Sequence, residues 1–254
     1  MKKTAYITGA SAGIGETFAN RLAGEYNLVI IARNEDKLNE VAKRHQTETV
    51  VKVIKADLSK SDDIKKVESE ILNDSSLGLV VNNAGFGTVG KFGELDLEKE
   101  TEEINLNVLA LTRLTHAGIK NFVKNKTEGK IINVASMVGF IPTPYSATYG
   151  ATKAFVKSFS EAIHEEYKKD NITIQVLCPG FTKTEFQDRA GFAKDNVPDF
   201  VWMSSEDVVE ESLEALKAKS AVCIPGFVNK STAALIDFTP GDWIRQFSGT
   251  FLKK

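Results

Sequence analysis

Cysteine, proline and tryptophan are scarce in this chain, with two, six and two residues among 254. Cys178 and Cys223 lie in separate apolar, strand-like segments and form no CxxC pair. This usage excludes a disulfide framework and gives no sign of a metal site. We expect two buried, reduced thiols, no bound metal and a cytoplasmic protein.

Long apolar runs and an excess of one charge are also missing. No segment approaches the ~20 apolar residues of a membrane span, so none is expected. The formal net charge is −2 and no long basic run occurs, which argues against a nucleic-acid partner. The chain shows no internal repeat or low-complexity linker, so we expect one domain over residues 1–254.

The order of apolar and amphipathic segments predicts the fold class. Buried strands are expected at 4–8, 26–32, 50–56, 77–81, 130–136, 172–178 and 221–224. Helices are expected at 35–46, from Ser61, at 96–124, at 149–170 and at 204–219. The alternation predicts an α/β, Rossmann-type, doubly wound sheet of about seven parallel strands with helices on both faces.

A glycine-rich turn follows the first strand, with the sequence Thr8-Gly9-Ala10-Ser11-Ala12-Gly13-Ile14-Gly15. Such a turn between a strand and a helix lets a pyrophosphate approach the backbone and the N-terminal N–H groups of the helix. The alternative is a plain tight turn without a ligand.

The second strand ends at Ala32, where sites that prefer NAD carry an acidic residue, and Arg33 follows. A guanidinium binds phosphate oxygens well, so NADP(H) is favoured, while NAD(H) stays possible. Arg33 facing solvent is the alternative, and Lys37 fits a solvated helix residue better than a phosphate ligand.

Further polar residues follow the third and fourth strands. Asp57 can accept a hydrogen bond from an adenine amino group; its alternative, capping the next helix, suits Ser61 better. Asn82-Asn83-Ala84-Gly85 combines small residues, which allow a ligand close to the backbone, with amides that can join neighbouring strands.

Two asparagines interrupt the expected helix at 96–124. A buried asparagine without a partner is costly, so one of them should face the site or a water molecule. Asn107 fits that position better than Asn105. We expect the apolar face of this helix to hold Ile104, Leu106, Val108 and Leu111.

Tyr149 stands four residues before Lys153, on the same face of a helix, and Ser136 ends the preceding strand. A serine, a tyrosine and a lysine brought together suggest a tyrosine acid/base whose pKa is lowered by the lysine and whose substrate is oriented by the serine. A half-buried tyrosine beside a surface lysine is the alternative.

Taken in order, these motifs resemble those of the short-chain dehydrogenase/reductase family, of the short single-domain type and its NADP-preferring branch. The resemblance covers nearly the whole chain and also includes Pro179-Gly180. Ala12 stands where part of that branch has a basic residue, so Arg33 would carry most of the NADP preference.

The resemblance implies a role for each site residue. Tyr149 would be the general acid or base, Lys153 would bind the nicotinamide ribose, and Ser136 would bind the substrate oxygen. Asn107 would hold a water that relays protons to Lys153. The remaining cofactor contacts would come from Gly9, Ser11, Gly13, Ile14, Gly15, Asn83, Ala84, Gly85, Pro179, Gly180, Thr182 and Thr184.

We therefore expect hydride transfer between NADP(H) and a carbonyl or alcohol, in a homodimer or homotetramer. A catalytically silent NADP(H)-binding regulator is the alternative; an epimerase or dehydratase would need a longer C-terminal substrate domain. The irregular segment 185–204 is expected to be a substrate lid, and with the loop 137–148 it suggests a moderately apolar substrate. Segment 229–254 is expected to make a subunit contact.

Overall fold

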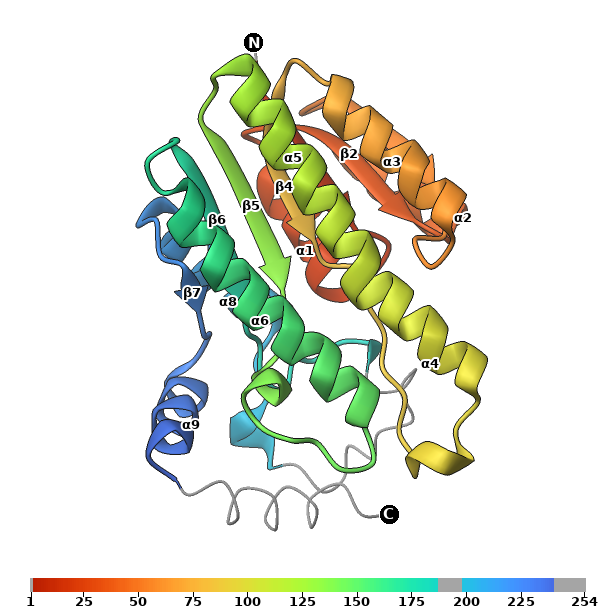
Figure 1. Cartoon of the computed structure of the whole chain (residues 1–254). Helices are drawn as coiled ribbons and strands as arrows, with labels where there is room; N and C mark the ends of the chain where they lie inside the picture. Colours follow the sequence, from red (N-terminus) through yellow and green to blue (C-terminus); the bar gives the residue numbers. More distant parts are fainter. Residues whose placement is uncertain (1, 187–197, 240–254) are drawn as a thin grey trace.

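The computed structural model describes residues 2–186 and 198–239 and builds them around one parallel sheet (Figure 1). The seven strands follow the order β3-β2-β1-β4-β5-β6-β7. Their bounds are Thr4–Thr8 (β1), Asn27–Ala32 (β2), Val51–Lys55 (β3), Leu77–Asn82 (β4), Gly129–Val134 (β5), Ile172–Leu177 (β6) and Val222–Cys223 (β7). The doubly wound fold and its seven parallel strands are thus as the sequence predicts.

Helices connect the strands. The longer ones are Gly13–Leu22 (α1), Glu35–His45 (α2), Ser61–Asn73 (α3), Leu97–Ile104 (α4), Leu111–Asn125 (α5), Ala147–Tyr167 (α6), Ser205–Lys217 (α8) and Phe227–Phe238 (α9). Short 3-10 helices span Phe92–Glu94 (η1), Met137–Phe140 (η3) and Asp199–Val201 (η5), and Asn105–Ala110 (η2) is a π-helix.

The helices cover both faces of the sheet, and each face has its own apolar cluster. Phe18 of α1 and Val208 of α8 pack against alternate strand residues on one face. Val67 of α3 and Leu114 of α5 pack on the other face, with α6 beside them (Figure 1). Strands buried on both faces explain why their sequences read as nearly continuous apolar runs.

The strand order reverses between β1 and β4, which are neighbours in the sheet but not in the sequence. Two connections leave in opposite directions at such a point, which opens a crevice outside the carboxyl ends of the strands. The segments after β1, β2, β4, β5 and β6 all begin at this edge. The fold therefore gathers the motifs of the sequence at one end of the sheet.

The expected helix at 96–124 is continuous, but its middle is the π-helix η2 and its buried face differs in part from the prediction. Leu111 is buried and Leu106 is partly buried, as predicted, whereas Ile104 is 47% exposed. The inward face also carries the charged Glu103, which the prediction, made from apolar content, did not include. Ser61 is also not a cap, because the helix α3 begins at it and Lys60 precedes it without a side-chain cap.

Cys178 and Cys223 are free thiols and both are buried, as expected. Within the described residues, no helix is long and apolar enough to cross a membrane. Of the expected lid, 187–197 lies outside the described residues, and so does 240–254 of the C-terminal segment. The described part of that segment lies in α9.

Candidate active site

The glycine-rich turn joins β1 to α1, and two of its glycines have backbone angles that favour glycine. Gly9 has φ +68° and Gly13 has φ +56°. A Cβ on Gly15 would lie 2.4 Å from both the Gly9 carbonyl oxygen and the Asn83 side-chain nitrogen. Among the described residues, no side chain caps the N-terminus of α1, which begins at the carboxyl edge of the sheet. This cradle fits an anionic pyrophosphate.

Hydrogen bonds join the ends of β1 and β4 beside that turn. The Thr8 hydroxyl accepts from the backbone N–H groups of Asn83 and Ala84, each at 3.0 Å. The Asn83 side chain donates to the Thr8 carbonyl at 2.9 Å. Asn82 joins β4 to β5 by donating to the Asn133 side chain at 2.9 Å. The expectation that these asparagines tie neighbouring strands is confirmed.

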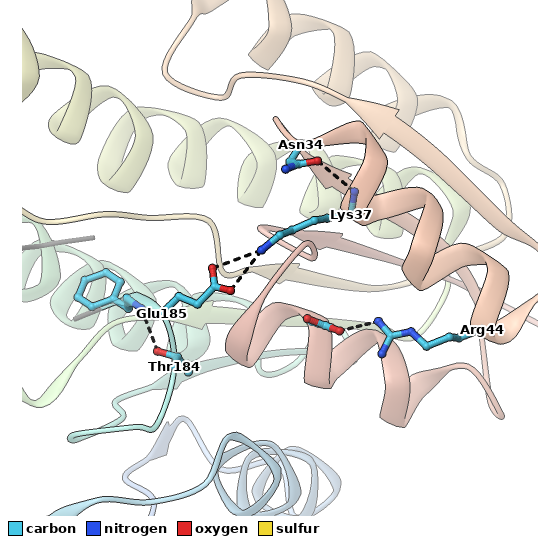
Figure 2. Close-up of polar contacts among 7 residues, drawn as sticks. Asn34, Lys37, Arg44, Thr184 and Glu185 are labelled. Atoms are coloured by element: carbon cyan, nitrogen blue, oxygen red, sulfur yellow. Dashed lines mark hydrogen bonds and ion pairs between the residues drawn. The ribbon is translucent and has the colours of Figure 1, made fainter. Parts of the chain in front are cut away.

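Arg33 is exposed directly after β2, and within the described residues its guanidinium has no hydrogen-bond or ion-pair partner. Lys37, one turn into α2, is not simply solvated as expected, because its ammonium lies 3.2 Å from the Glu185 carboxylate (Figure 2). β2 and β6 are separated in the sheet by β1, β4 and β5. The ion pair therefore reaches across the carboxyl edge.

Asp57 follows β3 and is partly buried. One oxygen of its carboxylate accepts from the Ser59 N–H at 3.1 Å and from the Ser59 hydroxyl at 2.8 Å. Its own backbone N–H donates to Asp63 at 2.7 Å. Asp57 thus forms a local turn before α3.

Ser136, Tyr149 and Lys153 meet at the ends of β5 and α6. The Ser136 hydroxyl lies beside the Tyr149 phenol, whose pKa it lowers, and it donates to the Pro179 carbonyl at 3.5 Å. The Lys153 ammonium lies 5.6 Å from the Tyr149 ring centre and donates to the Val134 carbonyl at 2.8 Å. The half-buried tyrosine beside a surface lysine is excluded, because Lys153 is only 4% exposed.

In this structure the surroundings of Tyr149 raise its pKa on balance. Burial raises that pKa most, the Ser136 hydroxyl lowers it, and the charge of Glu103 raises it. Burial also lowers the pKa of Lys153 to about 8, while the charge of Glu103 acts in the opposite direction. Proximity follows from helical spacing, whereas the loss of hydration that dominates here depends on the surrounding fold.

The loop after β4 packs on the tyrosine. A Cβ on Gly87 would lie 2.8 Å from Cδ2 of the Tyr149 ring, so only a glycine fits there without displacement. The Phe186 ring lies 5.5 Å from the Tyr149 ring, centre to centre. Phe186 is the second residue of the expected lid 185–204. The start of that lid therefore contacts the candidate acid/base.

Asn107 is buried, as predicted, but its side chain binds protein groups. It donates to the Phe86 carbonyl at 2.8 Å and to the Thr152 hydroxyl at 3.1 Å, and it accepts from the Phe86 N–H at 3.2 Å. A Cβ on Gly85 would lie 2.9 Å from the Asn107 side-chain oxygen and 3.5 Å from the Lys153 ammonium. Asn107 thus fixes the loop after β4 against α6.

The segment after β6 reaches back over the glycine-rich turn. The Pro179 carbonyl accepts from the Met137 N–H at 2.9 Å. Thr182 is buried and pairs with Met203 in a β-bridge. A Cβ on Gly13 would lie 3.0 Å from the methyl group of Thr184. The Thr184 hydroxyl accepts from the Phe186 N–H at 3.3 Å (Figure 2).

Three residues that the sequence did not single out support or adjoin this site. Asn229 of α9 is buried, and a Cβ on Gly180 would lie 2.3 Å from its side-chain oxygen. Glu100 and Glu103 of α4 are buried, and the charge of Glu103 acts on Tyr149. Their burial could have been predicted from the sequence. Both acids lie in helical register with Leu111 and Leu114, further along the same face.

Comparison with known proteins gives concordant matches. The sequence model for the short chain dehydrogenase family matches residues 3–194. A 7beta-hydroxysteroid dehydrogenase of Mediterraneibacter gnavus is 31% identical over 255 residues, covering 98% of this chain and 95% of that protein.

Two solved structures extend the similarity to three dimensions. A short-chain dehydrogenase from Sphingobium yanoikuyae in complex with NADPH has a TM-score of 0.83 at 34% identity, covering 94% of this chain and 96% of that chain. A bulky-bulky ketone specific alcohol dehydrogenase from Comamonas testosteroni has a TM-score of 0.80 at 32% identity, covering 94% and 95%.

Proposed function

Because the chain belongs to the short-chain dehydrogenase family, and is thus an oxidoreductase, we propose that it reduces a bulky, moderately apolar ketone with NADPH. The observation that carries this proposal is the meeting of Ser136, Tyr149 and Lys153 at the carboxyl edge of the sheet. That edge also holds the glycine cradle, so a bound nicotinamide and the tyrosine would lie on the same side of the sheet.

The residues divide the chemistry between them. A bound NADPH supplies a hydride to the carbonyl carbon. Ser136 hydrogen-bonds the carbonyl oxygen, and the Tyr149 phenol gives that oxygen its proton. Lys153 binds the nicotinamide ribose and favours the phenolate that remains. Asn107 holds a relay water beside Lys153.

Lowering the pKa of Tyr149 toward neutrality needs more than the side chains supply. A free tyrosine has a pKa of about 10, and each unit of lowering corresponds to ~1.4 kcal/mol of preferential phenolate stabilisation. Lys153 is close enough to contribute, and the positive charge of the oxidised nicotinamide would add to it.

The cofactor preference is proposed on Arg33. Its guanidinium, unpaired within the described residues, is available to the 2′-phosphate of NADPH. Ala32 stands where a carboxylate would repel that phosphate, and Asp57 is proposed to bind the adenine. A paired titration of NADPH and NADH tests this on the wild type and Arg33→Ala. We expect the wild type to bind NADPH at least ~tenfold more tightly than NADH, which corresponds to ~1.4 kcal/mol of binding free energy. The substitution should erase this difference. Equal binding of NADH by the wild type would refute the preference.

The substrate class is proposed from the aromatic side chains beside Tyr149 and in the segment after β6, and from the relatives. The Phe186 ring lies 5.5 Å from the Tyr149 ring, and the Phe181 ring lies 5.4 Å from the Trp202 ring. Turnover of NADPH with a panel from small polar ketones to steroids tests this. We expect the bulky apolar ketones to react fastest. No turnover with any carbonyl, despite tight NADPH binding, would favour the silent regulator instead.

We also propose one domain that carries both cofactor and substrate sites, a cytoplasmic setting consistent with the two buried thiols, and a homodimer or homotetramer. A subunit contact is supported by three exposed apolar side chains: Ile104 at the end of α4, Leu109 in η2 and Phe155 in α6.

A further inference from the structure

Two buried carboxyl groups lie close to the candidate acid/base. Glu100 and Glu103 of α4 are 2% and 0% exposed. Within the described residues, neither forms an ion pair with a lysine or arginine. A buried, unpaired carboxylate is strongly disfavoured, so the interior must either hydrogen-bond it or keep it protonated.

The hydrogen bonds around the pair fit one shared proton. The Thr88 hydroxyl lies 2.6 Å from Glu100 and 3.3 Å from Glu103, and Thr148 donates to the other oxygen of Glu100. A hydroxyl has a single proton to donate. If Thr88 donates to Glu100, its contact with Glu103 is satisfied only when Glu103 is the donor. The arrangement therefore suits a charged Glu100 and a protonated Glu103.

Among the described residues, the groups that face Glu103 come from α4, from α6 and from the loop after β4. Glu100 lies on its own helix, Lys153 and Tyr149 face it from α6, and the loop after β4 contributes the uncharged Thr88. Burial and the charge of Glu100 raise the pKa of Glu103 to about 7, against the opposing effects of Thr88 and Lys153. Glu103 can thus exchange a proton near neutral pH.

The second oxygen of Glu103 has no hydrogen-bond partner among the described residues, although it is fully enclosed. An unsatisfied oxygen inside a protein marks a place for a water molecule or a proton. Asn107 follows Glu103 by one turn and approaches Lys153 around Gly85. The acid pair is therefore adjacent to the proposed proton relay.

We propose that Glu103 stores the proton that carbonyl reduction consumes and returns it to the site through Lys153. This inference rests on the proposed function. Tyr149 gives its proton to the substrate oxygen, the Lys153 ammonium reprotonates Tyr149, and the Glu103 carboxylic acid reprotonates Lys153. Glu103 is left as a carboxylate, which solvent reprotonates before the next turnover.

Infrared spectroscopy tests the stored proton without any turnover. In the full-length wild type, we expect the carbonyl stretch of a protonated carboxylic acid to be lost with a midpoint near pH 7. Glu103→Gln should abolish this band, and Glu102→Gln should keep it, because Glu102 pairs with Lys60 at the surface. A Glu103→Gln spectrum identical to that of the wild type would overturn the proposal.

Glu100→Gln supplies a test that does not require the first variant to fold. Removing the like charge lowers the pKa of Glu103, so the midpoint of the infrared band should move to lower pH. An unchanged midpoint would show that the two acids do not share a proton, and would overturn the proposal.

The pH profile of kcat tests the proton supply. For the wild type, kcat for reduction should fall as Glu103 deprotonates around pH 7. In Glu103→Gln this step should vanish, with a loss of kcat smaller than the ~10²-fold of a direct general acid, while Glu102→Gln keeps the wild-type profile. A purely structural role would lower stability but leave the step in place, which would overturn the proposal.

These readouts separate the inference from the proposed function. A wild type that reduces no ketone but keeps the infrared band would refute carbonyl reduction and, with it, the supply step. Turnover with bulky ketones but no protonated acid near neutral pH would refute only the stored proton.

Discussion

Gly15 shows how closely the residues of the cofactor cradle depend on one another. Its missing side chain leaves room for Asn83, whose amide fixes the end of β4 to β1. The same contact brings the loop that carries Gly85 and Gly87 over Lys153 and Tyr149. One glycine in the first turn thus positions both the pyrophosphate cradle and the tyrosine.

Gly15→Ala should therefore weaken both folding and NADPH binding. Its Cβ would lie 2.4 Å from a backbone oxygen, and overpacking of this kind costs ~1–3 kcal/mol. Thermal unfolding and NADPH titration check this. Gly24→Ala is the matched control, because nothing lies within 4 Å of a Cβ there and its stability and binding should stay at wild-type values. Equal effects of the two variants would contradict the cradle.

Among the helices and strands, the sequence predicted placement better than packing. The four-residue spacing of Tyr149 and Lys153 predicts their shared face because a helix turns every 3.6 residues. The strand-turn-helix order likewise predicts the glycine cradle. Both depend on local backbone geometry alone.

Packing between elements was harder to predict. A charged residue normally marks the solvent side of a helix, so Glu103 gave no expectation of burial. Its register with Asn107 and Leu111 shows the true face, and both α4 and the π-helix at Asn105–Ala110 contact α6. The ion pair of Lys37 with Glu185 was missed because its partners are 148 residues apart. Ion pairs between distant segments depend on the order of the strands in the sheet, which cannot be read directly from the sequence.

That ion pair connects α2 with the segment after β6, over the carboxyl edge. Glu185→Gln should leave stability within ~1 kcal/mol of the wild type, since the pair is exposed. It should raise the dissociation rate of NADPH by up to ~fivefold, because one contact across the cradle is lost. Stopped-flow displacement measures this rate.

Arg44→Gln is the matched control for the ion pair. Arg44 also lies on α2, and its ion pair with Glu16 at 2.5 Å joins α2 to α1 without crossing the edge (Figure 2). Its NADPH dissociation rate should equal that of the wild type. An unchanged rate for Glu185→Gln would show that the pair does not hold the cofactor.

At the scale of the whole molecule, large apolar side chains on α4, η2 and α6 are exposed. Ile104 is 47% exposed, Leu109 43% and Phe155 41%. If this surface joins subunits, light scattering should give a multiple of 27.8 kDa for the wild type. Phe155→Lys should lower that mass, since it buries an unpaired charge in the contact. A monomeric wild type would contradict the proposed oligomer.

The central proposal is that Tyr149 donates a proton while NADPH delivers a hydride to a ketone. Its most direct test compares NADPH oxidation by the wild type and Tyr149→Phe, with a bulky ketone that the wild type reduces. We predict that kcat/KM falls by ~10²-fold or more while the affinity for NADPH changes little, because only the phenol is removed. Turnover by Tyr149→Phe at the wild-type rate would contradict the proposed chemistry.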